Sequence, residues 1–135
     1  MWADLLLILF GGLSAQAAMQ TIQGYIYHEG LDDFRGLPKV KVELIDWGFF
    51  KNKFCGSTIA DSTGFFKISC NPAPWRIDNG QRLKIYHRFD RGNCRVNVYR
   101  GRGEWGRVTS GNFSATYDDE EESDNSLCPA DLYPV

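Results

Sequence analysis

The sequence contains few of the residues on which active sites and metal sites are built. It has only two histidines, His28 and His87, and its four cysteines include no Cys-x-x-Cys pair. Neither residue type is therefore spaced as a set of zinc ligands, and neither histidine has a nucleophile or a carboxylate partner at a recognisable spacing. A glycine-rich phosphate loop is also missing. We therefore expect a protein that is not an enzyme and that holds no cofactor or metal.

Long apolar runs are also scarce. The one near the start of the chain, Leu5 to Phe10, is too short to cross a bilayer, and it is followed by the small-x-small pattern Ala15-Gln16-Ala17. This pattern predicts a signal peptide over residues 1–19 and a mature domain over residues 20–135. A buried N-terminal helix is the alternative. Because no second apolar stretch or lipidation motif follows, we expect a soluble protein secreted into the extracellular space.

The cysteines agree with a secretory route. All four, Cys55, Cys70, Cys94 and Cys128, follow the predicted signal peptide. Disulfides are typical of proteins in oxidising compartments, and four cysteines allow three pairings. Asn112 begins an Asn-Phe-Ser sequon, which in a secreted protein predicts N-linked glycosylation.

Acidic charge is concentrated in one segment. Acidic residues fill six of the seven positions 118–124, whereas the rest of the mature chain holds ten acids against fifteen bases. The segment is interpreted as a solvated linker. A calcium site is the alternative, although the segment lacks the spaced ligands and the glycine of an EF-hand loop. The molecule is therefore expected to be dipolar.

Helical periodicity of useful length is absent, and short alternating stretches separated by turn residues take its place. The predicted strands are 21–27, 40–46, 54–60, 65–70, 82–88, 94–100 and 107–117, followed by a short closing segment near 127–133. Seven or eight strands at this spacing predict an all-β fold, a two-sheet sandwich of antiparallel strands with Greek-key connections.

The turn Asp61-Ser62-Thr63-Gly64 predicts a hairpin between the strands 54–60 and 65–70. Asp can bond the local backbone in such a turn, and Gly accepts a positive φ. Counting outward from the turn places Cys55 nearly opposite Cys70, so these two residues are predicted to form a disulfide. By remainder, Cys94 is predicted to pair with Cys128.

A second hairpin is predicted over residues 83–98, around a polar turn at 90–93. We interpret it as a hairpin with one buried face, on which His87 is a hydrogen-bonded core histidine. Two sets of alternating residues would share that face: Leu83, Ile85 and His87 before the turn, and Cys94, Val96 and Val98 after it.

Several short motifs occur in an order that resembles a known family. They are Ile22-Gln23-Gly24, Gly36-Leu37-Pro38 before Val40-Lys41-Val42-Glu43-Leu44, the 61–64 turn before Phe65-Phe66, Leu83-Lys84-Ile85-Tyr86-His87, and Cys94-Arg95. Together they resemble the secreted transthyretin-like proteins of nematodes over nearly all of the mature chain. The resemblance implies a transthyretin-like sandwich and a secretory route, with no chemistry common to the family.

Two features depart from the family pattern. The family usually has a cysteine just after Tyr-His, as partner of the one in Cys-Arg, and this chain has Phe89 there. Cys94 must therefore pair elsewhere. The family's C-terminal Tyr-Asp-x-Gly strand is replaced after Tyr117-Asp118 by acidic residues, which leaves the pairing of the last strand open.

Three connections would emerge at the same end of the sandwich if consecutive strands run antiparallel. All three combine aromatic and basic residues, a mixture that suits an anionic membrane: tryptophan settles at the headgroup level, and each Lys or Arg contributes about 1 kcal/mol near the surface. The candidate binding residues are Trp47, Lys51, Lys53, Trp75, Arg76, Arg100, Arg102, Trp105 and Arg107. The alternatives are that loop aromatics such as Phe49 and Phe50 cap the core, and that the basic residues solubilise the protein or bind acidic glycans.

These observations lead to one preferred function and one alternative. The preferred function is a secreted adaptor that binds phosphatidylserine on cell surfaces. The family resemblance includes a bridging protein that links this lipid on dying cells to an engulfment receptor, so the expected partners are an anionic membrane and a receptor ectodomain. No nucleic-acid partner is expected, and the protein should be a monomer or a weak dimer. The alternative is a carrier of a small lipophilic ligand, as distant likeness to transthyretin suggests.

Overall fold

The computed structural model describes residues 20–46, 52–70, 80–102, 106–115 and 120–135. The predicted signal peptide over 1–19 lies outside these residues. The described chain forms eight strands and one short 3-10 helix: β1 (Gln20–Tyr27), β2 (Lys41–Asp46), β3 (Lys53–Ile59), β4 (Phe65–Cys70), β5 (Gln81–Asp90), β6 (Asn93–Arg100), β7 (Gly111–Ser114), β8 (Glu120–Glu122) and η1 (Asn125–Leu127).

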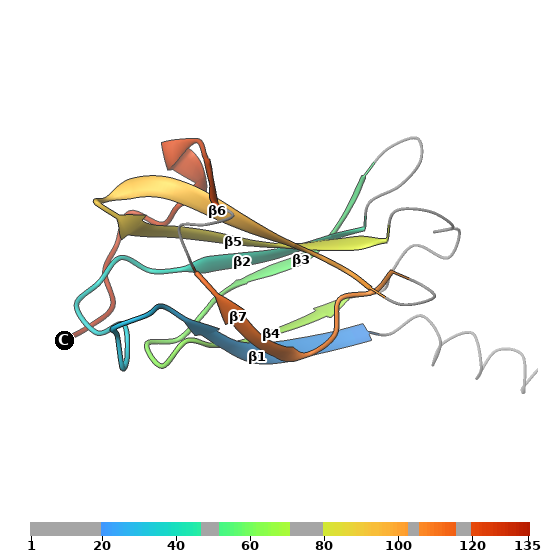
Figure 1. Ribbon diagram of the computed structural model, residues 1–135, viewed down its shortest axis with the longest axis horizontal. Coiled ribbons are helices and arrows are strands. Elements are labelled where there is room, and N and C mark those ends of the chain that lie inside the picture. The colour runs from blue at the N-terminus through green and yellow to red at the C-terminus, as the bar shows by residue number, and fades with distance from the viewer. Residues whose placement is uncertain (1–19, 47–51, 71–79, 103–105, 116–119) are drawn as a thin grey trace, which may run out of the picture.

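The strands form two sheets that pack face to face as a sandwich (Figure 1). The smaller sheet has the order β4-β1-β7, and the larger one has the order β3-β2-β5-β6-β8. All pairings are antiparallel except that of β1 with β7. The predicted all-β, two-sheet architecture is therefore confirmed, whereas β7 is shorter than the predicted strand 107–117.

The core lies between the two sheets and follows from the alternation in the sequence. Val40, Val42 and Leu44, at or just before β2, are fully buried, and Ile22 and Ile26 on β1 are almost as inaccessible. Side chains in a strand point alternately to the two faces, so residues two apart enter the same core. Tyr133, near the C terminus, completes this core by accepting a hydrogen bond from the Val40 N–H at 3.0 Å.

Both predicted disulfides are confirmed, but the predicted 54–70 hairpin is wrong. β3 pairs with β2 and β4 pairs with β1, so the 61–64 turn carries the chain from one sheet to the other. The Cys55–Cys70 disulfide joins the two sheets, with its Cα atoms 5.4 Å apart. Asp61 still shapes the turn, because its carboxylate accepts hydrogen bonds from the backbone of Thr63 and Phe65.

The β5–β6 hairpin forms as predicted, but its two halves do not share one face. Its two-residue turn, Arg91-Gly92, has positive φ at both positions, as a type I′ turn requires. A register shift between His87 and Asp90 then changes which residues face inward. Asn97 therefore points into the main core beside His87. Cys94 and Val96 instead join Tyr86 and Cys128 in a second small cluster, with Val98 packed against it.

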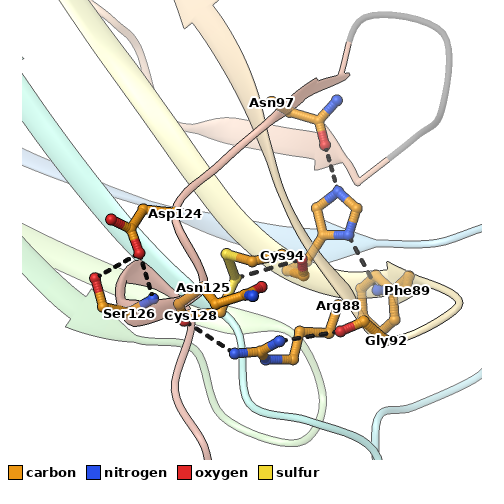
Figure 2. Close-up of a disulfide and its surroundings, with 10 residues drawn as sticks. Arg88, Phe89, Gly92, Cys94, Asn97, Asp124, Asn125, Ser126 and Cys128 are labelled. Carbon is orange, nitrogen blue, oxygen red and sulfur yellow. Dashed lines mark hydrogen bonds between the residues drawn. A yellow bond between two sulfur atoms is a disulfide. The ribbon is translucent and has the colours of Figure 1, made fainter.

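The C-terminal segment covers this second cluster. β8 adds to the edge of the larger sheet by pairing with Arg95–Asn97, so part of the acidic segment is a strand and not wholly a linker. The chain then forms η1 and reaches Cys128, whose disulfide to Cys94 has a Cα separation of 5.8 Å. Figure 2 shows Arg88 donating to the carbonyl oxygens of Gly92 and Asn125, which ties the segment to the hairpin turn.

Candidate functional site

One end of the sandwich collects the ends of five strands. β2 ends at Asp46, which pairs with Lys53 at the start of β3 and with Gln81 at the start of β5. Arg82 pairs with Arg100 at the end of β6. The end of β4 is linked to β3 there by the Cys55–Cys70 disulfide. The connections between β2 and β3, β4 and β5, and β6 and β7 therefore start and finish at this end, which we call the basic end.

Gln81 fixes the backbone at the basic end. Its side chain is fully buried, and its amide exchanges two hydrogen bonds with the amide of Gln20, at 2.8 and 2.5 Å. The same amide donates to Asp46 Oδ1 at 2.9 Å and accepts from the Val108 N–H at 3.0 Å. All hydrogen-bonding positions of the buried Gln81 amide are thus occupied. Because these bonds form in one arrangement only, they fix β5 relative to β2 in the same sheet and to β1 in the other.

Glycines allow the backbone between β6 and β7 to approach the backbone of Gln81 closely. The Gln81 N–H donates to the carbonyl oxygen of Gly106, and the Gly101 N–H donates to that of Gln81. A Cβ on Gly101 would lie 1.9 Å from the Gly106 oxygen, and one on Gly80 would lie 2.2 Å from it. Only glycine fits at such a close approach of backbone to backbone. The position of the neighbouring Arg102 and Arg107 therefore depends on these glycines.

Three arginines line a groove at this end. The groove encloses about 530 Å³ and runs along β6 and β7. Tyr99 and Phe113 also line it, with their rings edge to face at 5.2 Å, and the Tyr99 hydroxyl donates to the carbonyl oxygen of Ser114 across the sheets. The residues around the groove are Asn97, Val98, Tyr99, Arg100, Arg102, Arg107, Val108, Thr109, Asn112 and Phe113.

The arginines of the groove form a concentration of positive charge. Arg100, Arg102 and Arg107 are exposed, and within the described parts of the chain no carboxylate forms an ion pair with any of them. Arg82, the cross-strand neighbour of Arg100, is buried. Burial and then the charge of Arg100 lower the pKa of the Arg82 guanidinium. An anion in the groove would reduce this repulsion between like charges.

The structure brings together some of the sequence-predicted binding residues. Arg100, Arg102 and Arg107 line one groove, and Lys53 is exposed at the same end of the molecule, on β3. Trp47, Lys51, Trp75, Arg76 and Trp105 lie outside the described residues. The sequence does not predict that Gln81, Gln20 and Asp46 form part of the site. A polar residue at the end of a strand gives no sign that it will bond to residues of distant strands.

The two histidines, His28 just after β1 and His87 on β5, come together near the turn of the β5–β6 hairpin. Phe89 stacks between His28 and His87, with ring centroids 4.7 and 5.3 Å away. His87 is fully buried, as expected of a core histidine, and bonds Asn97 Oδ1 at 2.9 Å through Nε2. Burial is the main reason that the pKa of His87 falls to about 4. This histidine is therefore neutral and structural at physiological pH.

A metal-binding group and a membrane-spanning helix are both missing from the described residues. In the ranges that the structure describes, no three or more His, Cys, Asp or Glu side chains are grouped so that they could hold a metal ion. Within the same ranges, no helix is long and apolar enough to cross a membrane.

Comparison with known proteins assigns no family. No protein-family model and no curated protein matches the sequence. Among solved structures, the chain is similar to a 9R-lipoxygenase from Cyanothece PCC8801, with a TM-score of 0.47 and 13% sequence identity. The match covers 74% of this chain but only 17% of the lipoxygenase chain. A similarity at this level carries no inference about activity, so the function has to be argued from the groove itself.

Proposed function

We propose that this protein is a secreted adaptor with a transthyretin-like sandwich, without enzymatic activity. In this proposal the basic end binds phosphatidylserine on the surface of dying cells, and another surface binds a phagocyte receptor. The observation that carries the lipid half is the convergence of Arg100, Arg102 and Arg107 around one groove. The receptor half rests on the resemblance to nematode transthyretin-like proteins. The two disulfides are of the kind that proteins in oxidising compartments carry.

The chemistry of the groove suits a phospholipid headgroup. Phosphatidylserine presents a phosphate and a carboxylate close together, and guanidinium groups pair with both in bidentate fashion. The groove volume of about 530 Å³ lies in the usual range for sites that bind small molecules. In the sequence, Trp47, Trp75 and Trp105 fall in the three segments that connect strands ending here, and all three lie outside the described residues. Tryptophan there would anchor the protein at the level of the headgroups.

Vesicle sedimentation tests the lipid half. The protein should sediment with phosphatidylcholine vesicles that contain phosphatidylserine and stay in solution with phosphatidylcholine alone. Because each arginine near an anionic surface contributes about 1 kcal/mol, Arg102→Glu should weaken binding at least fivefold. Lys67→Glu is the matched control, because Lys67 is exposed on the outer face of β4, away from the groove. It should bind as the unchanged protein does.

Two results would contradict the lipid half. The first is equal sedimentation with and without phosphatidylserine. The second is equal weakening in Arg102→Glu and Lys67→Glu, which would indicate a response to net charge and not to the groove. Vesicles with phosphatidylglycerol in place of phosphatidylserine show whether the headgroup or only its charge is recognised. Pull-down with phagocyte receptor ectodomains tests the receptor half separately.

The carrier alternative receives less support. The groove at the basic end is lined by three arginines, which favour an anion over a wholly lipophilic ligand. A second hollow of about 340 Å³ lies at the far end, beside His28, Phe89 and Leu37, and it is also open to solvent. Carriers usually bury most of their ligand's surface. The adaptor is therefore the function that these residues support best.

A further inference from the structure

The outer face of the smaller sheet carries a strip of exposed aromatic residues. Tyr25 and Tyr27 on β1 point away from the core and are 50% and 51% exposed. Phe65 on β4 lies opposite Tyr25, and their rings are tilted against each other at 5.4 Å. Phe65 therefore supports one side of the Tyr25 ring, while the ring keeps half of its surface in solvent.

The sequon residue Asn112 lies on the other side of Tyr25. β7 runs parallel to β1 and places Asn112 directly beside Tyr25 in the register. Neighbouring strands in a sheet lie about 4.8 Å apart. Phe113 is buried next to Ile26, so the exposed side chain of Asn112 points to the outer face, as that of Tyr25 does.

We infer that Asn112 carries an N-linked glycan whose first N-acetylglucosamine packs on the ring of Tyr25. The face of an aromatic ring carries partial negative charge and attracts the weakly positive C–H groups on the apolar face of a sugar. Because Asn112 lies beside Tyr25, the first sugar can reach the ring directly. Little conformational entropy is then lost when the contact forms. This inference rests on the secretory route in the proposed function, because glycosylation requires it.

The arrangement also separates the glycan from the groove. Asn112 is one of the residues that line the groove, and its side chain points to the outer face of the smaller sheet. A glycan held on Tyr25 lies over β1 and leaves the arginines accessible. Occupancy of Asn112 and binding of an anion in the groove are therefore compatible.

Thermal unfolding of the full chain, secreted from eukaryotic cells, tests the inference. Mass spectrometry of the peptide that contains Asn112 first measures glycan occupancy. The glycosylated protein should unfold about 2–5 °C higher than Asn112→Gln, as expected for one additional aromatic contact in a domain of this size. Trimming with an endoglycosidase that leaves a single N-acetylglucosamine should keep this increment. Tyr25→Ala should abolish it, because comparing the increment with and without the ring cancels the loss of the Phe65 contact and leaves only the contact between ring and glycan.

The matched control is Phe54→Ala. Phe54 is 60% exposed, but it lies on β3 in the other sheet, so its loss should leave the glycan increment intact. If Tyr25→Ala is poorly secreted, Tyr25→Thr removes the ring while keeping a residue that favours strands. An unoccupied Asn112, an increment that survives loss of the Tyr25 ring, or one that is lost equally in Phe54→Ala would overturn the inference. Vesicle binding by Asn112→Gln is measured separately, so failure of the glycan contact and failure of lipid binding are distinguishable.

Discussion

His87 shows how a titratable side chain can be fully buried at little cost. The Phe89 N–H points at its Nδ1 at 3.2 Å, so Nδ1 is the acceptor and Nε2 carries the proton that Asn97 Oδ1 accepts. The neutral imidazole is thus satisfied at both nitrogens. A second proton would have to bind Nδ1. Two N–H donors, those of Nδ1 and of Phe89, would then point at each other, and the hydrogen bond between them would be lost.

The pH dependence of stability follows from this arrangement. Burial lowers the pKa of His87 from 6.5 to about 4 in the folded protein, so between these values the unfolded chain binds more protons. The contribution of His87 to stability is complete above pH 6.5 and falls as the pH drops toward 4, by about 3 kcal/mol in total. Free energies of unfolding from urea titrations at pH 7 and pH 4 measure this loss.

His87→Gln is the reference for this measurement, because glutamine does not titrate. Carboxylates that respond to acid are present in both proteins, so the difference between the two acid profiles reports His87 alone. The gap in stability between the two proteins should shrink by about 3 kcal/mol on going from pH 7 to pH 4. Parallel profiles would show that His87 does not titrate as proposed.

At the level of elements, the C-terminal segment depends on one covalent link. β8 contributes three residues to the edge of the larger sheet, and three residues alone make a weak strand. The Cys94–Cys128 disulfide closes a loop over a sequence separation of 34 residues, beside the bonds from Arg88. The Cys94–Cys128 disulfide therefore holds β8 and η1 in place, because the pairing of β8 with β6 is short.

Replacing Cys94 and Cys128 together by serine should cost about 4 kcal/mol of stability by the loop-entropy relation. Hydrogen exchange should then accelerate first in β8 and η1, because they lose their anchor to β6. The matched control replaces Cys55 and Cys70, a link between the two sheets that closes a shorter loop and should cost about 3 kcal/mol. Unchanged exchange in β8 after loss of Cys94–Cys128 would show that strand pairing alone holds the segment.

The positions of individual strands are predicted well. β2, β3 and β4 are found at or within one residue of their predicted ends, and for β2 the signal is the alternation of Val40, Val42 and Leu44 with other residues. Strand pairing is harder to predict. The 61–64 turn has the residues of a tight turn, but turn chemistry does not say whether the next strand stays in the same sheet. The Cys55–Cys70 link was predicted from an assumed pairing, and it forms because the two strands are neighbours across the sandwich.

Other features depend on contacts that are distant in the sequence. β8 consists of glutamates, which are poor strand formers, and it becomes a strand because the edge of β6 is available. The face on which Val96 and Val98 lie depends on a register shift after His87, which no local pattern announces. At the candidate site, the sequence supplied the arginines, whereas Gln81 and the groove appear only when strands from both sheets meet.

At the scale of the whole molecule, the basic end and the hairpin turn are far apart. β5 has ten residues and β6 has eight, so about 25–30 Å separates Arg100 from the turn at Arg91-Gly92. This is about three times the distance over which salt screens charges at physiological ionic strength. The charged groups near the turn are also partly neutralised locally, since Arg95 pairs with Asp90 at 3.1 Å. Lipid binding at one end should thus be insensitive to charge at the other.

This separation allows a test of position with two variants of equal net charge. Arg100→Glu and Arg91→Glu change the charge of the molecule equally, but only Arg100 lines the groove. Arg91 has a positive φ of 55°, a strain that arginine and glutamate share, so the exchange is conservative for the backbone. At physiological salt, Arg100→Glu should weaken binding to phosphatidylserine vesicles at least fivefold. Arg91→Glu should change it by less than about twofold, because screening removes its influence at this distance. Equal weakening by both variants would mean that the vesicles respond to total charge, and that the arrangement of arginines around the groove has no part in recognition.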